Sequence, residues 1–263
     1  MKIKFAVRSD VGRVRTNNED NFFCNGIFMT VLERERPFFL SGFIDKPCIF
    51  AVCDGMGGED CGELASLTTV EALSKHSQNI LSNNNGGVQN FVKDANEKLC
   101  SIMNEQNLRM GTTLALAVMN EKSFSLYNIG DSRIYRLTNE RLLRVTDDHT
   151  LAEEKVRMGL ITPEKAEKDR DRHVLTRYLG IDEHEYGSTV SPDVYDSFNY
   201  DENKRILLCS DGLTEMLSYK DISTIMKKTS DVSDIVNNLV DAALFNGGRD
   251  NVTCIVAEIV KGG

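Results

Sequence analysis

Three aspartates stand where an apolar run meets a turn, and this shared context is the first sign of chemistry in the chain. Asp54 and Asp211 each follow an apolar run and precede a glycine, while Asp250 comes just before another such run. Taken singly, each would be an ordinary turn residue. Because strand ends place the adjoining side chains along one rim of a sheet, their common placement predicts that the three carboxylates meet.

Crowded carboxylates resist ionisation, and a divalent cation removes that penalty by accepting them as ligands. Oxygen ligands favour magnesium or manganese. Zinc is disfavoured because the seven cysteines and four histidines contain no pair at ligand spacing. The segment Asp54–Asp60 lacks the alternating oxygen ligands of a calcium-binding EF-hand loop. The expected cofactor is therefore Mn²⁺ or Mg²⁺.

The composition is that of an ordinary globular protein. Of 263 residues, 41% are hydrophobic and 27% charged, and the net charge of -9 disfavours nucleic acid or an anionic membrane as a partner. The seven cysteines include no Cys-x-x-Cys pair and are expected to be reduced, buried thiols. The early charges at the N-terminus and the lack of a long apolar run predict a cytoplasmic protein.

Strands and helices come in blocks along the chain rather than in strict alternation, which favours an α+β fold with two antiparallel sheets covered by helices. The segment Met29–Lys46 is expected to be an exposed hairpin or loop, and Asn83–Gly87 a turn between two helices. The strands expected between Leu114 and Val145 predict an antiparallel meander. Other apolar runs predict strands or helices; they are Ile3–Val7, Asn21–Phe28, Cys48–Cys53, Arg205–Cys209, Val232–Ala243 and Asn251–Ile259.

Seven short motifs occur in an order that resembles the PPM, or type 2C, serine/threonine protein phosphatases, and they span nearly the whole chain. They are Val11–Asp20, Asp54–Gly58, Gly111–Thr113, Gly130–Arg133, Leu175–Arg177, Ser210–Gly212 and Asp250–Thr253. The Met after Asp-Gly and the segment Thr146–His149 are similar to the bacterial branch of the family.

The resemblance implies a single catalytic domain over residues 1–263. Its expected fold is an α-β-β-α sandwich, in which two packed antiparallel sheets are flanked by helices on both sides, with a helical flap at about 150–172. Two metals would lie at one end, with a third, weaker site. The implied metal-site residues are Glu19, Asp20, Asp54, Gly55, Asp131, Asp211 and Asp250.

Within that set the resemblance assigns separate roles. Asp54 would bridge both metals, and Asp211 and Asp250 would complete one site. Glu19 and the Gly55 carbonyl would serve the other, partly through waters, with Asp20 close behind. Asp131 would help to hold the third metal. Arg15 is expected to clamp the substrate phosphate, and Arg15 and Asp54 are the expected catalytic residues.

The expected mechanism follows from two-metal chemistry: cations about 3.5 to 4 Å apart can share a water and lower its pKa from about 15.7 towards neutrality. The hydroxide then attacks phosphorus in line. Arg15 suits this task because its planar guanidinium donates two parallel hydrogen bonds to a phosphate. Met56 cannot donate a proton, so the general acid stays open between a metal-bound water and the histidines beside the flap, His149 and His173.

The predicted function is hydrolysis of phosphoserine and phosphothreonine in proteins, opposing a protein kinase in signalling. Expected partners are phosphorylated proteins, with a serine/threonine kinase and its substrates in the same pathway, and the chain is expected to be a monomer. Two alternatives stay open: a catalytically idle regulator that binds phosphoproteins, and a hydrolase of small phosphate esters.

Overall fold

Two antiparallel sheets form the centre of the computed structural model, which describes residues 2–57, 61–139, 141–182, 187, 189–201 and 203–260. The strands of the first sheet are, in spatial order, β3 (Phe38–Asp45), β1 (Lys2–Asp10), β12 (Val252–Val260), β11 (Asn203–Cys209), β8 (Arg133–Thr138) and β9 (Leu142–Arg144). Those of the second are β10 (Asp193–Asn199), β7 (Ser123–Ile129), β6 (Leu114–Met119), β4 (Cys48–Gly57) and β2 (Asp20–Cys24), and β5 (Met110–Thr112) pairs with the end of β4.

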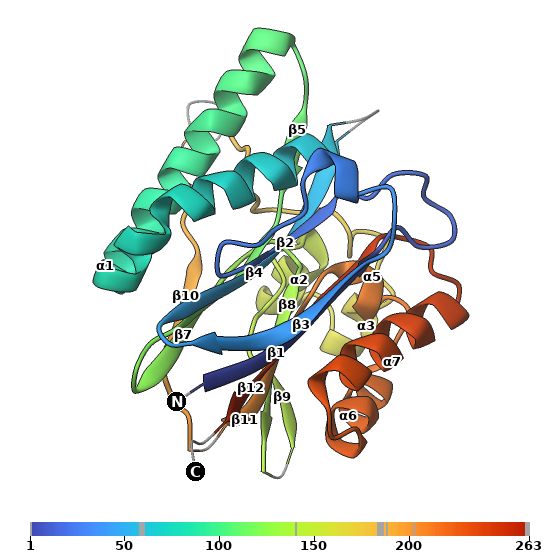
Figure 1. Cartoon of the computed structure of the whole chain (residues 1–263). Coiled ribbons are helices and arrows are strands. Elements are labelled where there is room, and N and C mark those ends of the chain that lie inside the picture. The colour runs from blue at the N-terminus through green and yellow to red at the C-terminus, as the bar shows by residue number, and fades with distance from the viewer. Residues whose placement is uncertain are drawn as a thin grey trace.

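Helices cover the outer face of each sheet, so the layers are helix, sheet, sheet, helix (Figure 1). The long helix α1 (Gly62–Gln106) packs on the second sheet. On the first sheet lie α6 (Tyr219–Lys228) and α7 (Val232–Phe245), with the short α5 (Asp211–Thr214) at its end. The expected α-β-β-α sandwich is confirmed.

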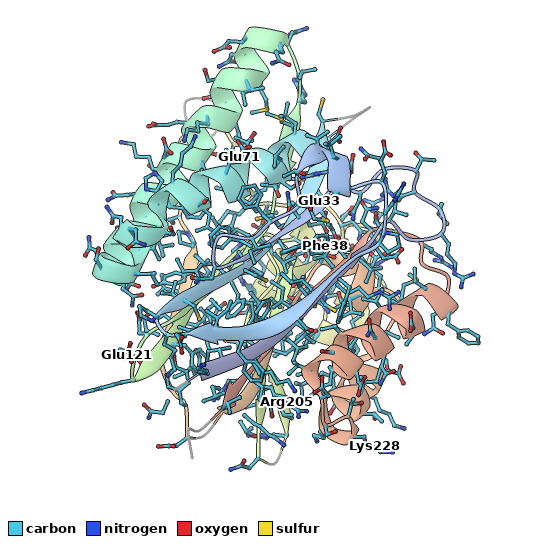
Figure 2. All side chains as sticks on the ribbon, viewed as in Figure 1. Glu33, Phe38, Glu71, Glu121, Arg205 and Lys228 are labelled. Carbon is cyan, nitrogen blue, oxygen red and sulfur yellow. The ribbon has the colours of Figure 1, made fainter. Side chains whose placement is uncertain are left out.

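Side-chain alternation along the strands divides the interior into three apolar layers. On β4, Phe50 and Val52 face the other sheet, whereas Ile49 and Ala51 face α1. The edge strand β3, on which Figure 2 labels Phe38, is covered on one face only, and Phe39 and Phe43 on its other face are exposed. The ring centroid of Phe38 lies 5.0 Å from that of Phe22. A strand with both faces covered must be apolar throughout, which explains the continuous runs of the sequence.

The segment 150–172, the expected flap, lies between β9 and β10 and contains two short helices, α2 (Leu151–Arg157) and α3 (Pro163–Ala166). Gly159 stands between them with φ at +71°, a value that favours glycine. The ammonium of Lys155 pairs with Asp169 at 2.8 Å and with Asp171 at 2.7 Å, which ties the end of the segment back to α2.

Several expected elements were wrong in detail. The segment 29–46 is more than a loop: after the 3₁₀ turn η1 (Val31–Glu33) it forms β3, whose alternating apolar residues complete the first sheet. The four strands from 114 to 145 are not one meander, because the chain changes sheet between β7 and β8. Gly130 allows that crossing with φ at +98°.

Other boundaries also moved. β4 continues to Gly57 rather than ending at Asp54, and the break in α1 involves Asn83 and Asn84 alone. The strand β10 and the helix α6 were not predicted. The end of α6 is held by Arg205 on β11, which donates to the carbonyls of Met226 and Thr229 at 3.0 and 2.7 Å. Across the described residues, no helix combines the length and apolarity needed to cross a bilayer.

Candidate active site

Strand ends from both sheets meet at one rim and enclose a cavity of about 420 Å³, here called the active-site cavity. β1, β4 and β11 finish at this rim, whereas β2, β8 and β12 begin there. Seven of the eight residues expected at the site line the cavity: Arg15, Glu19, Asp54, Gly55, Asp131, Asp211 and Asp250. The topology therefore brings together residues that are up to 235 positions apart in the chain.

The backbone of Asp54 is fixed by hydrogen bonds to Thr112 and Thr113, at the end of β5. Its backbone N–H donates to Thr113 Oγ1 at 2.9 Å, and its carbonyl accepts from the Thr113 N–H and the Thr112 hydroxyl, both at 2.9 Å. These three bonds hold the backbone of Asp54 and so set where its carboxylate points. The motif Gly111–Thr113 thus acts through Asp54.

Gly55 and Gly62 allow Glu19 to approach the site closely. A Cβ on Gly55 would lie 2.0 Å from the Gly62 carbonyl oxygen, and one on Gly62 would lie 2.6 Å from Cδ of Glu19. Neither position has room for a side chain. The Gly55 N–H also donates to the Glu19 carbonyl at 3.2 Å, which joins the two expected ligands of one metal.

Asp20 does not line the cavity; it lies behind Asp54, directly opposite it in the β2–β4 pairing. Its carboxylate is buried and accepts a hydrogen bond from Ser210 Oγ at 2.7 Å. Burial raises the pKa of Asp20 to about 7. This position agrees with the expectation that Asp20 stands behind the ligands, and its role stays a prediction.

The carboxyl groups of the cavity lie close together with too few positive charges nearby to balance them. Burial raises the pKa of Asp54 well above its usual range, and the charge of Asp20 adds to the effect. The pKa of Asp211 is raised well above normal by burial and by Asp131, and burial raises that of Asp131 to about 7. Anionic oxygens in such a position suit hard divalent cations. The donor set therefore fits the expected metals.

Glu215 was missing from the expected site, and His173 was expected there only as one candidate for the general acid. His173 follows the flap and Glu215 follows α5, and the two meet at the cavity wall with Nδ1 2.8 Å from Oε1. Together with Asp211 they bring potential ligand atoms within 4.8 Å of one another. The sequence offered only a histidine near the flap, because contact with α5 depends on the tertiary fold.

His149, the other histidine beside the flap, has a structural position. Its Nδ1 accepts from the Gly130 N–H at 3.0 Å, so the proton sits on Nε2, which lies 3.1 Å from the Asp193 carboxylate. Burial lowers the pKa of His149. These contacts hold the β7–β8 crossing that carries Asp131.

Asn251 organises the open side of the site and was also missed. Its Oδ1 accepts from the Glu19 N–H at 2.8 Å, and its Nδ2 donates to the carbonyls of Val11 and Asn17 at 2.9 and 2.8 Å. One buried amide thus fastens the loop between β1 and β2 to the start of β12. The pattern Asp250–Asn251 in the sequence could have indicated this.

Comparisons with known proteins agree with this geometry. The family model described as "Protein phosphatase 2C" matches residues 9–252. The serine/threonine phosphatase stp of Listeria innocua is 32% identical over 258 residues, which cover 95% of this chain and 94% of the relative. The crystal structure of the Mycobacterium tuberculosis serine/threonine phosphatase PstP/Ppp superposes with a TM-score of 0.82 at 30% identity, covering 99% of this chain and 100% of that one.

A further structure, the catalytic domain of PstP in complex with two manganese ions, superposes with a TM-score of 0.79 at 30% identity over 99% of this chain and 100% of that one. The family model, the relatives and the rim of carboxylates point the same way. The chain belongs to the protein phosphatase 2C family.

Proposed function

We propose that this chain hydrolyses phosphoserine and phosphothreonine in proteins. The observation that carries the proposal is the convergence of carboxylates from separate strand ends on one cavity, with an arginine at its open edge. The names of the relatives, serine/threonine phosphatases, support the same substrate class. A phosphorylated protein is therefore the proposed partner, with a serine/threonine kinase acting on the same proteins.

Two divalent cations would be held by the carboxylates of the cavity, Asp54 between them, Asp211 and Asp250 on one side and Glu19 with the Gly55 carbonyl on the other. When bound, they would supply a nucleophilic hydroxide at neutral pH and stabilise the charge that develops on the phosphoryl oxygens. Manganese or magnesium suits these oxygen donors. Asp131 is the proposed residue for a weaker third site.

Arg15 would bind the phosphate. Its side chain is half exposed at the edge of the cavity, where a substrate can reach it. The guanidinium fork matches two phosphoryl oxygens and orients the ester for attack from the side of the carboxylates. Asp20 would stay behind the ligands, where its carboxylate accepts a hydrogen bond from Ser210 Oγ.

His173 is the proposed proton donor to the leaving oxygen, the task that Met56 cannot perform. It lines the cavity close to Asp211, and its Nδ1 lies 2.8 Å from the Glu215 carboxylate, which orients the ring. A serine or threonine alkoxide is a poor leaving group, so donating a proton to the ester oxygen lowers the barrier.

The whole chain would act as one catalytic domain with the flap at 150–172, as a monomer in the cytoplasm. None of the seven cysteines, all of which the structure describes, forms a disulfide, and six are buried. Burial raises the pKa of Cys53, next to Asp54, so this thiol is kept protonated and is a poor nucleophile. These thiols suit a reducing compartment.

A metal-dependence assay on three substrates tests the proposal. Metal-stripped protein should be inactive, and added Mn²⁺ or Mg²⁺ should restore turnover of a phosphothreonine peptide but not of a phosphotyrosine peptide. Asp54→Asn, which replaces the expected carboxylate ligand with a neutral amide, serves as the inactive control. Turnover of an aryl phosphate with no peptide turnover would instead favour a small-ester hydrolase, and binding without turnover would favour an idle regulator.

A further inference from the structure

A second cavity of about 700 Å³ opens beside the active-site cavity and shares three wall residues with it, Met56, Gly57 and Leu175. We call it the apolar groove. One wall is the end of α1 and the turn into β5, the segments at the upper end of the molecule in Figure 1. The opposite wall is the stretch 175–180, which follows the flap.

Both walls are held by hydrogen bonds, so the groove is formed before anything binds. Thr112 on β5 and Leu179 exchange two backbone hydrogen bonds of 2.9 Å, which join the stretch 175–180 to the sheet. On the other wall, the Leu108 N–H donates to the Met103 carbonyl at 3.0 Å after the end of α1.

The groove is named for five apolar side chains, Met56, Met103, Leu108, Leu175 and Tyr178, which are all half-buried. Polar side chains complete its lining: Asn104, Asn107, Arg109 and Asp182. Met103, Leu108 and Tyr178 also pack against the core under α1, which supports them from behind. Half-exposed apolar side chains grouped beside a catalytic cavity mark a binding surface.

Gly111 forms the floor where the groove meets the active-site cavity. A Cβ on Gly111 would lie 2.6 Å from Cδ2 of Tyr178 and 2.9 Å from Cε of Met56. The missing side chain lets the ring and the thioether approach each other over the backbone. Methionine adapts its shape to different apolar partners, so this junction can accept more than one side chain.

We propose that the apolar groove binds a large apolar side chain of the substrate, such as leucine, methionine or phenylalanine, within three residues of the phosphorylated position. Continuity of the groove with the active-site cavity through Met56 and Leu175 selects this occupant. The inference rests on the proposed function. It makes Met103 and Leu108, which line the groove and not the active-site cavity, residues that determine specificity.

A scan of phosphothreonine peptides tests this. One leucine is moved through the three positions on either side of the phosphothreonine in a background of serine, and kcat/KM is measured with Mn²⁺ present. Leucine at one of these positions should raise kcat/KM about tenfold or more over the all-serine peptide, the scale of filling an apolar pocket. Equal kcat/KM for leucine at all six positions would overturn the proposal that the groove binds an apolar side chain.

Variants then locate the effect. Met103→Ser and Leu108→Ser should lower the ratio of kcat/KM between the preferred leucine peptide and the all-serine peptide towards one. The matched control, Phe43→Ser, removes an exposed apolar side chain on β3 outside the groove and should keep the ratio. A groove variant that keeps the wild-type ratio would overturn the assignment. Failure of the proposed function looks different, because no phosphothreonine peptide would then be hydrolysed at all.

Discussion

Arg15 Nη2 lies 2.8 Å from Oδ2 of Asp250, so the residue expected to hold phosphate is paired with a residue expected to hold metal. The hydrogen bond to Asp250 raises the pKa of Arg15. The guanidinium of Arg15 and a divalent cation would therefore compete for the carboxylate of Asp250. Loading the site with metal should therefore weaken this pair and free the guanidinium for a phosphate.

This competition gives the first prediction. Arg15→Ala should bind Mn²⁺ at least as tightly as wild type, while KM for a phosphopeptide rises about 10- to 100-fold, the scale of a lost charge-assisted bond. Arg15→Lys should restore the charge but only part of the affinity, since an ammonium lacks the fork. Calorimetric Mn²⁺ titrations beside steady-state kinetics decide the matter. Weaker Mn²⁺ binding in Arg15→Ala would mean that Arg15 supports the metal site.

The second prediction concerns the pH dependence of the metal-free protein. Asp20 and Asp131 have pKa values of about 7 in the fold, against about 3.9 in an unfolded chain. Between these values the folded state binds more protons, so the free energy of unfolding should fall as pH rises from 5 to 8. Urea unfolding of metal-stripped protein measures this, and saturating Mn²⁺ should reduce the slope.

Asp131→Asn provides the control for that slope. It removes one of the titrating groups and should flatten the curve. His149, whose pKa is lowered by burial, acts in the opposite direction below its ordinary value of 6.5, so the difference between wild type and variant isolates the carboxyl. A metal-free protein that becomes more stable from pH 7 to pH 8 would contradict the assignment of uncompensated carboxylates.

The third prediction tests His173 as the proton donor. His173→Gln should lower kcat on a phosphothreonine peptide by about 10²-fold, because an alkoxide needs a proton as it leaves. An aryl phosphate has a good leaving group, so its kcat should change much less. His76→Gln is the matched control, since His76 pairs with Asp94 on α1 away from the cavity. Equal losses on both substrates would assign His173 to the structure of the site instead.

The local sequence placed Asp54 and Asp211 at strand ends, because each follows an apolar run and precedes a glycine. Antiparallel strands end at both rims of a sandwich, so it is the pairing of β4 and β11 with their neighbours that brings these two ends to one rim. The hydrogen bonds that fix Asp54 could not be predicted either, because Thr113 lies 59 positions away and reaches it through β5. Motif order supplied the set of residues, and the fold supplied their contacts.

The errors have a similar physical origin. The alternation of β3 was present in the sequence, but the charged run before it suggested a loop. The contact between His173 and Glu215 joins an exposed segment to a helix end, and neither residue has a local pattern that indicates its partner. Pairing across the sandwich, rather than periodicity along the chain, decides such contacts.

The last prediction concerns Asn251, whose side chain is buried and makes three hydrogen bonds to the backbone of neighbouring segments. Asn251→Ala would leave the Glu19 N–H and two carbonyls without this partner, and each buried polar group left unpaired costs about 1–3 kcal/mol. The loop that carries Arg15 and Glu19 should loosen. We therefore expect a lower free energy of unfolding, weaker Mn²⁺ binding and a raised KM together.

Asn246→Ala is the matched control, because that exposed amide makes one hydrogen bond, to the Met216 carbonyl at 2.9 Å. Urea unfolding of metal-stripped protein and calorimetric Mn²⁺ titration of each variant give the comparison. Asn251→Asp should have a free energy of unfolding and a Mn²⁺ affinity between those of wild type and Asn251→Ala. Its carboxylate still accepts from the Glu19 N–H but cannot donate to the two carbonyls. If Asn251→Ala lost no more stability than Asn246→Ala and bound Mn²⁺ with wild-type affinity, the loop would be held by its other contacts, and Asn251 would have no part in positioning Glu19.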